Sequence, residues 1–212
     1  MDRINAPARG RTGVPESSGL DQPDHLDQLI EPLQVSPWNP RFDPGLLELM
    51  EAQKKSDKGW PPAYAHNMNL NEWLAGPANL IRLVGHSTQS GVLGHVGAGT
   101  PSSPKNISIW CETISCGPED IAEICRLIVT PKARRLGLSG LLTKRMVRAL
   151  VAQGITPVAT ALAEREASVK MMTSIGWEII GKEISARTGL DQYLLIAPQK
   201  IVTLAATNRL GK

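Results

Sequence analysis

One continuous stretch, residues 126–142, constrains the fold of this 212-residue chain more than any other part of the sequence. It opens with the apolar run Leu127-Ile-Val129, whose β-branched residues favour a strand. A basic turn containing Gly137 follows, and from Leu138 onward apolar residues recur at the spacings of three and four that are typical of a helix. The sequence therefore predicts a strand, a turn and a helix N-terminus in direct succession.

The turn has the chemistry of an anion site. A helix N-terminus carries backbone N–H groups without intrahelical partners and a positive partial charge. Residues 124–163 contain no Asp or Glu but seven basic residues: Arg126, Lys132, Arg134, Arg135, Lys144, Arg145 and Arg148. We therefore expect an anionic group to bind here. An ordinary strand-to-helix connection with a basic rim is the alternative.

Other phosphate-binding and nucleic-acid-binding patterns do not fit the turn. The sequence has no G-x-x-x-x-G-K-[ST], which excludes a P-loop, and no G-x-G-x-x-G after a strand, which disfavours a dinucleotide fold. The basic residues are not interleaved with aromatic ones and belong to no recognised nucleic-acid-binding module. We expect no nucleic-acid partner.

The letters of the turn resemble a known motif. Arg134-Arg-Leu-Gly-Leu-Ser139, preceded by Leu127-Ile-Val-x-Pro131, resembles motif A of the GNAT N-acetyltransferase superfamily, with Ser139 where Gly or Ala is usual. The segment Ser168 to Trp177 resembles a later motif of that superfamily, but Met172 stands where a Tyr often serves as general acid. Arg165 likewise stands where Asn is common. The resemblance spans roughly residues 29–197.

The resemblance implies both the fold and the reaction. The fold is α/β (α+β), with a single mixed, mostly antiparallel central sheet flanked by helices. We expect a disordered or loosely docked N-terminal arm over residues 1–27, a GNAT-like domain over 28–198 and a tail over 199–212. The reaction implied is transfer of an acetyl or other acyl group from acetyl-CoA to a primary amine, without a metal. A non-catalytic acyl-CoA-binding or interaction module is the alternative, and acyl-homoserine-lactone synthesis is a minor third.

The resemblance also assigns the cofactor site. The backbone of the strand is expected to pair with the pantetheine arm of coenzyme A, and the N–H groups of the turn to hold its pyrophosphate. The cofactor-binding residues are therefore Leu127, Ile128, Val129, Arg134, Arg135, Leu136, Gly137, Leu138, Ser139 and Gly140.

Glu123 is the predicted catalytic base, and it also belongs to the predicted substrate-binding set. An alkylamine is protonated at neutral pH, so a proton acceptor has to lie near the thioester. Glu123 precedes Arg134 by eleven residues, a spacing similar to that of the catalytic Glu in the histone-acetylating branch. If the strand is regular, residues 121, 123, 125, 127 and 129 share one face, and apolar neighbours raise the pKa of Glu123. A structural carboxylate paired with a Lys or Arg is the alternative reading.

Other candidates complete the predicted site. A Pro-rich loop places Trp60 and Tyr64 either in the wall of a substrate pocket or in the core beneath the loop. If Glu123 is not the base, Glu112, Glu164, His95 or water takes its place. The candidate proton donors to the leaving thiolate are water, Ser168, Thr173 and Tyr193.

Hydrophobic periodicity and turn residues predict the other elements. Strands are expected at 29–35, 79–84, 91–97, 107–114, 121–129, 157–162, 177–180 and 190–196, and helices at 43–56, 69–74, from 138, and 166–175.

Composition adds expectations about environment. The net charge is only +3, and Cys111, Cys116 and Cys125 lack paired metal-ligand spacing. No apolar run is long enough to span a membrane, and the first residues lack the apolar core of a signal peptide. We expect a cytoplasmic protein with reduced thiols and no membrane partner. A homodimer is left open.

Overall fold

A computed structural model describes residues 32–56, 69–76 and 78–198. It contains a seven-stranded sheet in the order β1-β2-β3-β4-β5-β7-β6. Only β4 and β5 pair in parallel, while every other neighbouring pair is antiparallel. The strands are β1 (Gln34–Pro37), β2 (Ile81–Ser87), β3 (Gly91–Gly99), β4 (Ile121–Val129), β5 (Thr156–Leu162), β6 (Glu178–Ile184) and β7 (Asp191–Ile196). The predicted fold class is confirmed.

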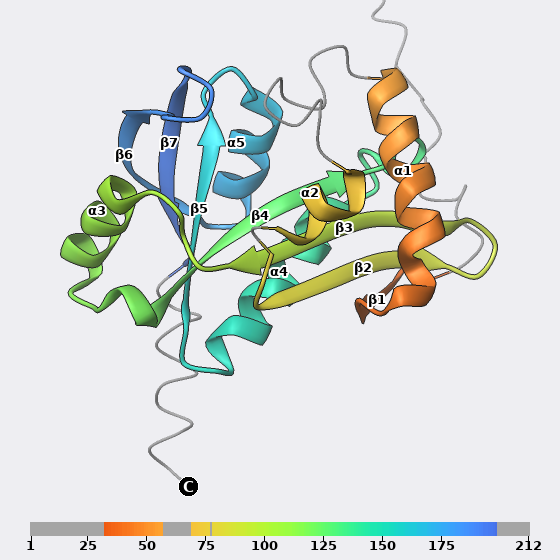
Figure 1. Cartoon of the computed structure of the whole chain (residues 1–212), viewed down its shortest axis with the longest axis horizontal. Coiled ribbons are helices and arrows are strands. Elements are labelled where there is room, and N and C mark those ends of the chain that lie inside the picture. The colour runs from red at the N-terminus through yellow and green to blue at the C-terminus, as the bar shows by residue number, and fades with distance from the viewer. Residues whose placement is uncertain (1–31, 57–68, 77, 199–212) are drawn as a thin grey trace, which may run out of the picture.

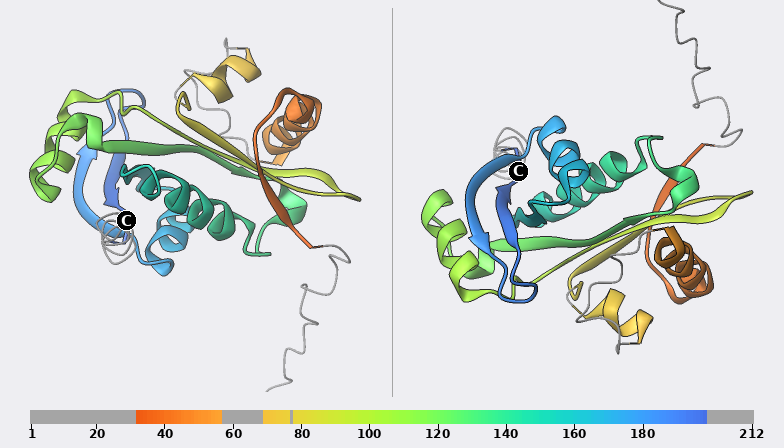
Figure 2. Two further views of the ribbon diagram at one scale, coloured as in Figure 1. Left: turned by 90° about the horizontal axis from the view of Figure 1, so that it is seen from below. Right: turned by 90° about the horizontal axis from the view of Figure 1, so that it is seen from above.

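Helices cover both faces of this sheet (Figures 1 and 2). One face carries α1 (Asp43–Ser56), α2 (Leu70–Ala75) and α3 (Pro104–Ile114), and the other carries α4 (Leu138–Val151) and α5 (Glu166–Ser174). Under α4, Leu142 and Met146 are fully buried in the largest apolar cluster. Leu46 of α1 and Trp110 of α3 belong to two smaller clusters on the opposite face. The central strands β3 and β4 are therefore covered on both sides.

The predicted strand at 107–114 is wrong, because these residues belong to helix α3. Ser103 is the N-cap, and its Oγ accepts a hydrogen bond from the backbone N–H of Asn106 at 3.3 Å, with Pro104 in the first turn. Ile107 and Ile109 alternate as in a strand, but the fully buried Trp110 follows Ile107 at a helical spacing of three. The capping signal, rather than the alternation, decided this segment.

The other predicted elements form, with shifted ends. The predicted strand at 29–35 begins outside the described residues, and the observed β1 starts at Gln34. Asp43 is the first residue of α1, and its Oδ1 accepts a hydrogen bond from Trp38 Nε1 at 2.9 Å. The hairpin β2–β3, the strand–turn–helix unit from β4 to α4, and the closing strands are close to their predicted positions. The predicted arm over 1–27 and the tail over 199–212 lie outside the described residues.

A β-bulge interrupts β4, so the predicted face shared by residues 121, 123, 125, 127 and 129 is wrong. Arg126 has φ +53°, and the register between β3 and β4 shifts at this point. Before the bulge, Ala122 and Ile124 face the α4 side, whereas after it Leu127 and Val129 pack against the same cluster. Glu123 is left on the opposite face from Leu127. The bulge thereby separates the predicted base from the predicted pantetheine strand across the sheet.

Candidate active site

The strands β4 and β5 separate at the middle of the sheet (Figure 1). Their parallel pairing ends at Ile124 and Ala159. Beyond this point a cleft of about 700 Å³ lies between the second half of β4, the end of β5 and the first turns of α5. We call it the β4–β5 cleft. Its wall includes Leu127, Ile128 and Val129, the residues predicted to bind pantetheine. Open ends of separated strands offer unpaired backbone groups to an extended ligand.

The predicted pyrophosphate turn lies at the end of this cleft, where Arg134 and Ser139 line the wall. Gly137 adopts φ +74° and is the N-cap of α4. The N–H of Arg134 bonds to Pro131 O at 3.3 Å, so it is not available to a ligand. Within the described chain, the N–H groups of residues 135–140 have no backbone acceptor. These N–H groups are therefore open to an anionic ligand, and anion binding at the turn stays a prediction, without the N–H of Arg134.

Most of the seven basic residues lie away from the cleft. Lys144, Arg145 and Arg148 lie on the exposed side of α4. Arg134 is the member of the set that lines the cleft, and its Nη2 donates to Gln53 Oε1 of α1 at 2.6 Å. The local charge of the site is therefore smaller than the sequence cluster suggested, because a helix distributes its side chains around its axis. Backbone N–H groups are the larger contribution.

Glu123 lies on the face of the sheet that carries α3, beside Thr160 of β5. Thr160 Oγ1 donates a hydrogen bond to Glu123 Oε1 at 2.7 Å. Burial raises the pKa of Glu123 above its ordinary value, against the smaller opposing effects of the Thr160 hydrogen bond and the charges of Arg187 and Arg126. This direction agrees with the sequence prediction. The alternative, a strand carboxylate paired with a nearby Lys or Arg, stays open: none of the ion pairs among the described residues includes Glu123, but the charges of Arg187 and Arg126 act on it.

A smaller cavity of about 210 Å³ lies in the gap between β4 and β5. We call it the gap cavity. It shares Thr160 with the cavity that contains Glu123. It shares five residues with the β4–β5 cleft: Leu127, Leu162, Arg165, Ser168 and Met171. Thr160 therefore borders both the gap cavity and the cavity that contains Glu123, and Leu127 borders both the gap cavity and the cleft.

The proton-donor candidates differ in whether they line the gap cavity and the β4–β5 cleft. Met172 lines the gap cavity at the position expected for the usual Tyr. Ser168 lines both the gap cavity and the cleft. Thr173 donates to the carbonyl groups of its own helix, and Tyr193 packs against the main core, so neither lines these cavities. Ser168 is the best placed of the three candidates.

The residues named as alternatives to Glu123 also differ in their access to these cavities. Glu164 lines the β4–β5 cleft, whereas Glu112 lies on the exposed side of α3. His95 is fully buried, and its Nδ1 donates to Arg126 O at 2.9 Å while its Nε2 accepts from Arg82 Nε at 3.3 Å. Burial is the largest cause that lowers the pKa of His95 to about 4. Both ring nitrogens are therefore occupied, and His95 supports the bulge rather than reaching a substrate.

Arg126, at the bulge, is held from two directions. Besides the bond from His95 to its carbonyl group, Arg126 Nε donates to Trp73 O of α2 at 2.9 Å. Its guanidinium lies over the Trp73 ring, with Cζ 3.9 Å from the ring centre. These contacts come from β3 and α2, so tertiary packing holds a non-glycine residue at positive φ.

Sequence reasoning missed several residues of the site, and two of the residues that it named cannot be located in the described part of the chain. Trp60 and Tyr64 lie outside the described residues. Asn106, Arg187 and Gln192 line the Glu123 cavity with Thr160, but none of them was predicted. The Ser103-Pro104 capping signal could have found Asn106, since a helix starting there has Asn106 in its first turn. Arg187 and Gln192 carried no local signal.

Comparison with known proteins agrees with this architecture. Residues 107–186 match the family model of FR47-like protein, which is GNAT-related. The match begins in α3 and extends past β6, so it contains the bulge, the turn and α5. No curated protein sequence gives a significant match.

Solved structures of acetyltransferases share the fold. A GCN5-related N-acetyltransferase from Kribbella flavida superposes with a TM-score of 0.59 at 17% identity, covering 78% of this chain and 97% of that one. The ribosomal-protein-S18-alanine N-acetyltransferase from Escherichia coli superposes with a TM-score of 0.54 at 12% identity, covering 79% of this chain and 94% of that one. Naa20 from Chaetomium thermophilum, in complex with a bisubstrate analogue, superposes with a TM-score of 0.56 at 18% identity, covering 81% of this chain and 89% of that one.

The protein therefore belongs structurally to the α/β proteins that have an N-acetyltransferase fold. More specifically, the fold and the family match together support the GNAT superfamily, as the two sequence motifs predicted. In the part of the chain that the structure describes, no group of three or more His, Cys, Asp or Glu could hold a metal ion. No described helix combines the length and apolar character that a membrane span requires.

Proposed function

We propose that the protein is an N-acyltransferase that moves an acetyl group from acetyl-CoA to a primary amine by direct attack. The observation that carries this proposal is the β4–β5 cleft, which begins where strand pairing stops and ends at the N-terminus of α4. The volume of the cleft, about 700 Å³, and its lining suit an extended thioester with an anionic group at the turn. The Naa20 structure contains a bisubstrate analogue, which supports a two-substrate site in this fold.

Each part of the cleft has a role in this proposal. The backbone of residues 127–129 pairs with the pantetheine arm, as an added strand would. The N–H groups of residues 135–140 hold the pyrophosphate, with Arg134 beside them. Gly137 has a positive φ, which would be strained for a residue with a side chain. Because it has no side chain, it leaves the backbone of the turn open to the phosphate groups. Ser139 at the cleft wall is small enough to leave the backbone accessible.

Glu123 acts as the base in the proposed reaction. It removes a proton from the incoming ammonium, and the amine nitrogen then attacks the thioester carbon. The C–N bond forms and the C–S bond breaks, the nitrogen gives a second proton to water, and coenzyme A leaves as a thiolate that takes up one proton, so that one proton is released overall. Its raised pKa brings Glu123 nearer to neutrality, which suits a group that must both accept and release a proton. Ser168 or water returns the proton to the thiolate.

A non-catalytic acyl-CoA-binding module is the second candidate function. It is favoured by Met172, which has no proton to give at the position of the usual general acid. A thiol is acidic enough to leave unassisted, so we expect the missing acid to slow turnover by about ten- to a hundredfold without abolishing it.

A free-thiol assay and a binding assay separate these functions. With acetyl-CoA and a panel of amines, the enzyme proposal predicts amine-dependent release of coenzyme A thiol. The module proposal predicts thermal stabilisation by acetyl-CoA with no thiol release above the protein-free control. Stabilisation of less than about one degree at saturating acetyl-CoA would contradict both, because a ligand that binds only the folded state must stabilise it.

A further inference from the structure

A separate cavity of about 360 Å³ lies on the α3 side of the sheet. We call it the α3 cavity. Its walls come from the first turn of α3, from β4 and β5, and from the end of the β6–β7 hairpin. The polar residues in its wall are Ser102, Ser103, Asn106, Glu123, Thr160, Ser185, Arg187 and Gln192. A cavity with so many hydrogen-bonding groups is suited to a polar ligand.

Two carboxamides line this cavity, those of Asn106 and Gln192. Asn106 is 5% exposed and Gln192 is 8% exposed. Neither side chain forms a hydrogen bond within residues 32–56, 69–76 and 78–198. A carboxamide offers two donors and an acceptor, and in these two residues the polar atoms are not among the fully buried atoms without a partner, so they open onto the cavity. Such groups therefore point to a ligand that completes their hydrogen bonds.

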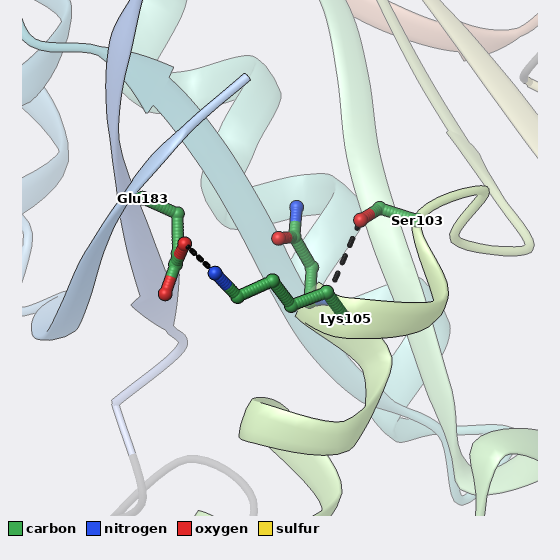
Figure 3. Close-up of polar contacts among 4 residues, drawn as sticks. Ser103, Lys105 and Glu183 are labelled. Atoms are coloured by element: carbon green, nitrogen blue, oxygen red, sulfur yellow. Dashed lines mark hydrogen bonds and ion pairs between the residues drawn. The ribbon is translucent and has the colours of Figure 1, made fainter. Parts of the chain in front are cut away.

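The helix that supplies Asn106 is held in place at its first turn (Figure 3). Ser103 caps the helix, and Lys105 Nζ forms an ion pair with Glu183 of β6. The strands β3 and β4 are antiparallel neighbours, which a short turn can join, yet residues 100–120 separate them. The chain thus places a fixed helix beside Glu123 where the topology does not require one.

The charges in the cavity are one carboxylate and one guanidinium. Glu123 and Arg187 both line it, and the two groups are close enough to interact electrostatically. A ligand that carries one ammonium and one carboxylate would complement both. A polyamine would bring several ammonium groups to a wall with a single carboxylate, which is unfavourable.

The cavity also leads toward the proposed cofactor. Thr160 lines both the α3 cavity and the gap cavity, and it donates its hydroxyl proton to Glu123. An amine placed against Glu123 and Thr160 therefore faces the opening between β4 and β5, on the opposite side of which Leu127 lies.

We propose that the α3 cavity takes a small zwitterionic amine, an α-amino acid or a close analogue, as the acyl acceptor. The ammonium lies against Glu123, the carboxylate lies against Arg187, and Asn106 and Gln192 bond to the remaining polar groups. This inference rests on the proposed acyl transfer. The nitrogen loses a proton to Glu123 and forms the C–N bond, and the C–S bond breaks as described above.

The first experiment tests the role of the acceptor carboxylate. Free amino acids are compared with their primary amides in the thiol-release assay. For the wild type we expect kcat/KM to be at least about tenfold higher for the acid, the effect of one charge-assisted hydrogen bond. Arg187→Gln should remove this preference, because it lowers kcat/KM for the free amino acid while kcat/KM for the amide stays within about twofold of the wild-type value. Because each variant is compared on both acceptors, the intrinsic reactivity of the amines cancels.

Matched variants control for unrelated effects. Lys182→Gln makes the same charge change on the same hairpin, but Lys182 pairs with Asp191 and lies outside the cavity wall, so the acid preference should persist. Asn106→Asp adds a carboxylate to the cavity and should raise KM for the acid by about tenfold or more, with less effect on the amide.

Binding measurements distinguish failure of this inference from failure of the proposed function. If acetyl-CoA binds and polyamines or peptides are the preferred acceptors, or if Arg187→Gln leaves the acid preference intact, the inference is overturned and acyl transfer stands. If acetyl-CoA does not bind, acyl transfer fails, and the cavity is tested by thermal shift with about 10 mM amino acids alone. A shift that Arg187→Gln abolishes supports the zwitterion site, whereas the absence of a shift overturns it.

Discussion

The buried histidine under the bulge gives the most quantitative prediction. His95 has an ordinary pKa of 6.5 in the unfolded chain and a pKa of about 4 in the folded protein, mainly because the ring is removed from water. Between these values the unfolded state binds a proton that the folded state does not. Stability from this group is therefore complete above pH 6.5 and is lost as the pH falls toward 4.

The size of the effect follows from the shift. Each unit of pKa difference corresponds to about 1.4 kcal/mol, so the difference between 6.5 and about 4 contributes about 3 kcal/mol to the pH dependence. His95→Asn removes the titration and keeps a donor that can reach Arg126 O. We expect the free energy of unfolding of the wild type to fall by about 3 kcal/mol more than that of the variant over this range.

Urea denaturation at half-unit pH steps between 7 and 4 measures both proteins. The difference in slope should approach about 1.4 kcal/mol per pH unit, which is the signature of one proton. His86→Asn, at a partly exposed ring on the neighbouring strand, controls for loss of a histidine elsewhere in the sheet. Parallel curves for the wild type and His95→Asn would refute the argument that burial holds His95 neutral.

Four further predictions concern Glu123, the turn at Gly137 and the proton donor. Glu123→Gln should lower kcat/KM by about 10²- to 10⁴-fold while acetyl-CoA still binds, and wild-type activity should fall as the pH drops through the raised pKa of Glu123. Calorimetry should find Glu123→Gln more stable than the wild type at pH 7, because ionisation of the buried carboxyl group opposes folding above pH 4.5. Equal stability of the two proteins would count against the raised pKa of Glu123. Gly137→Val should abolish stabilisation by acetyl-CoA, whereas Gly189→Val, at a similar positive φ and also in open space, should not. Ser168→Ala should slow kcat by up to about tenfold if Ser168 returns the proton, and Thr173→Val on the same helix should leave kcat unchanged; equal rates for both would assign the donor to water.

Local signals were sufficient for the central unit of the fold. The β-branched run, Gly137 and the apolar spacing from Leu138 act within a few residues of one another, so the strand, turn and helix could be read directly. The segment at 107–114 was misread because Ile107 and Ile109 satisfy the strand period while Trp110 satisfies the helical one. The N-cap at Ser103 resolved that ambiguity in the folded chain.

The site depended on contacts that the sequence does not display. Arg126 adopts a positive φ because His95 and Trp73, distant in sequence, hold its carbonyl and guanidinium groups. A regular pleat would have placed Glu123 on the same face as Leu127, and the bulge prevents this. Arg187 and Asn106 likewise converge on one cavity only because β6, β7 and α3 pack against the same part of the sheet.

The central claim is that acetyl-CoA binds in the β4–β5 cleft, and amide hydrogen exchange with and without acetyl-CoA tests it most directly. Residues 127–129 and 135–140 offer backbone groups that a pantetheine arm and a pyrophosphate would bond. We predict that saturating acetyl-CoA slows exchange in these two segments, and that Gly137→Val loses the effect in the turn. Protection confined to other parts of the chain, or no protection despite measured binding, would contradict the claim.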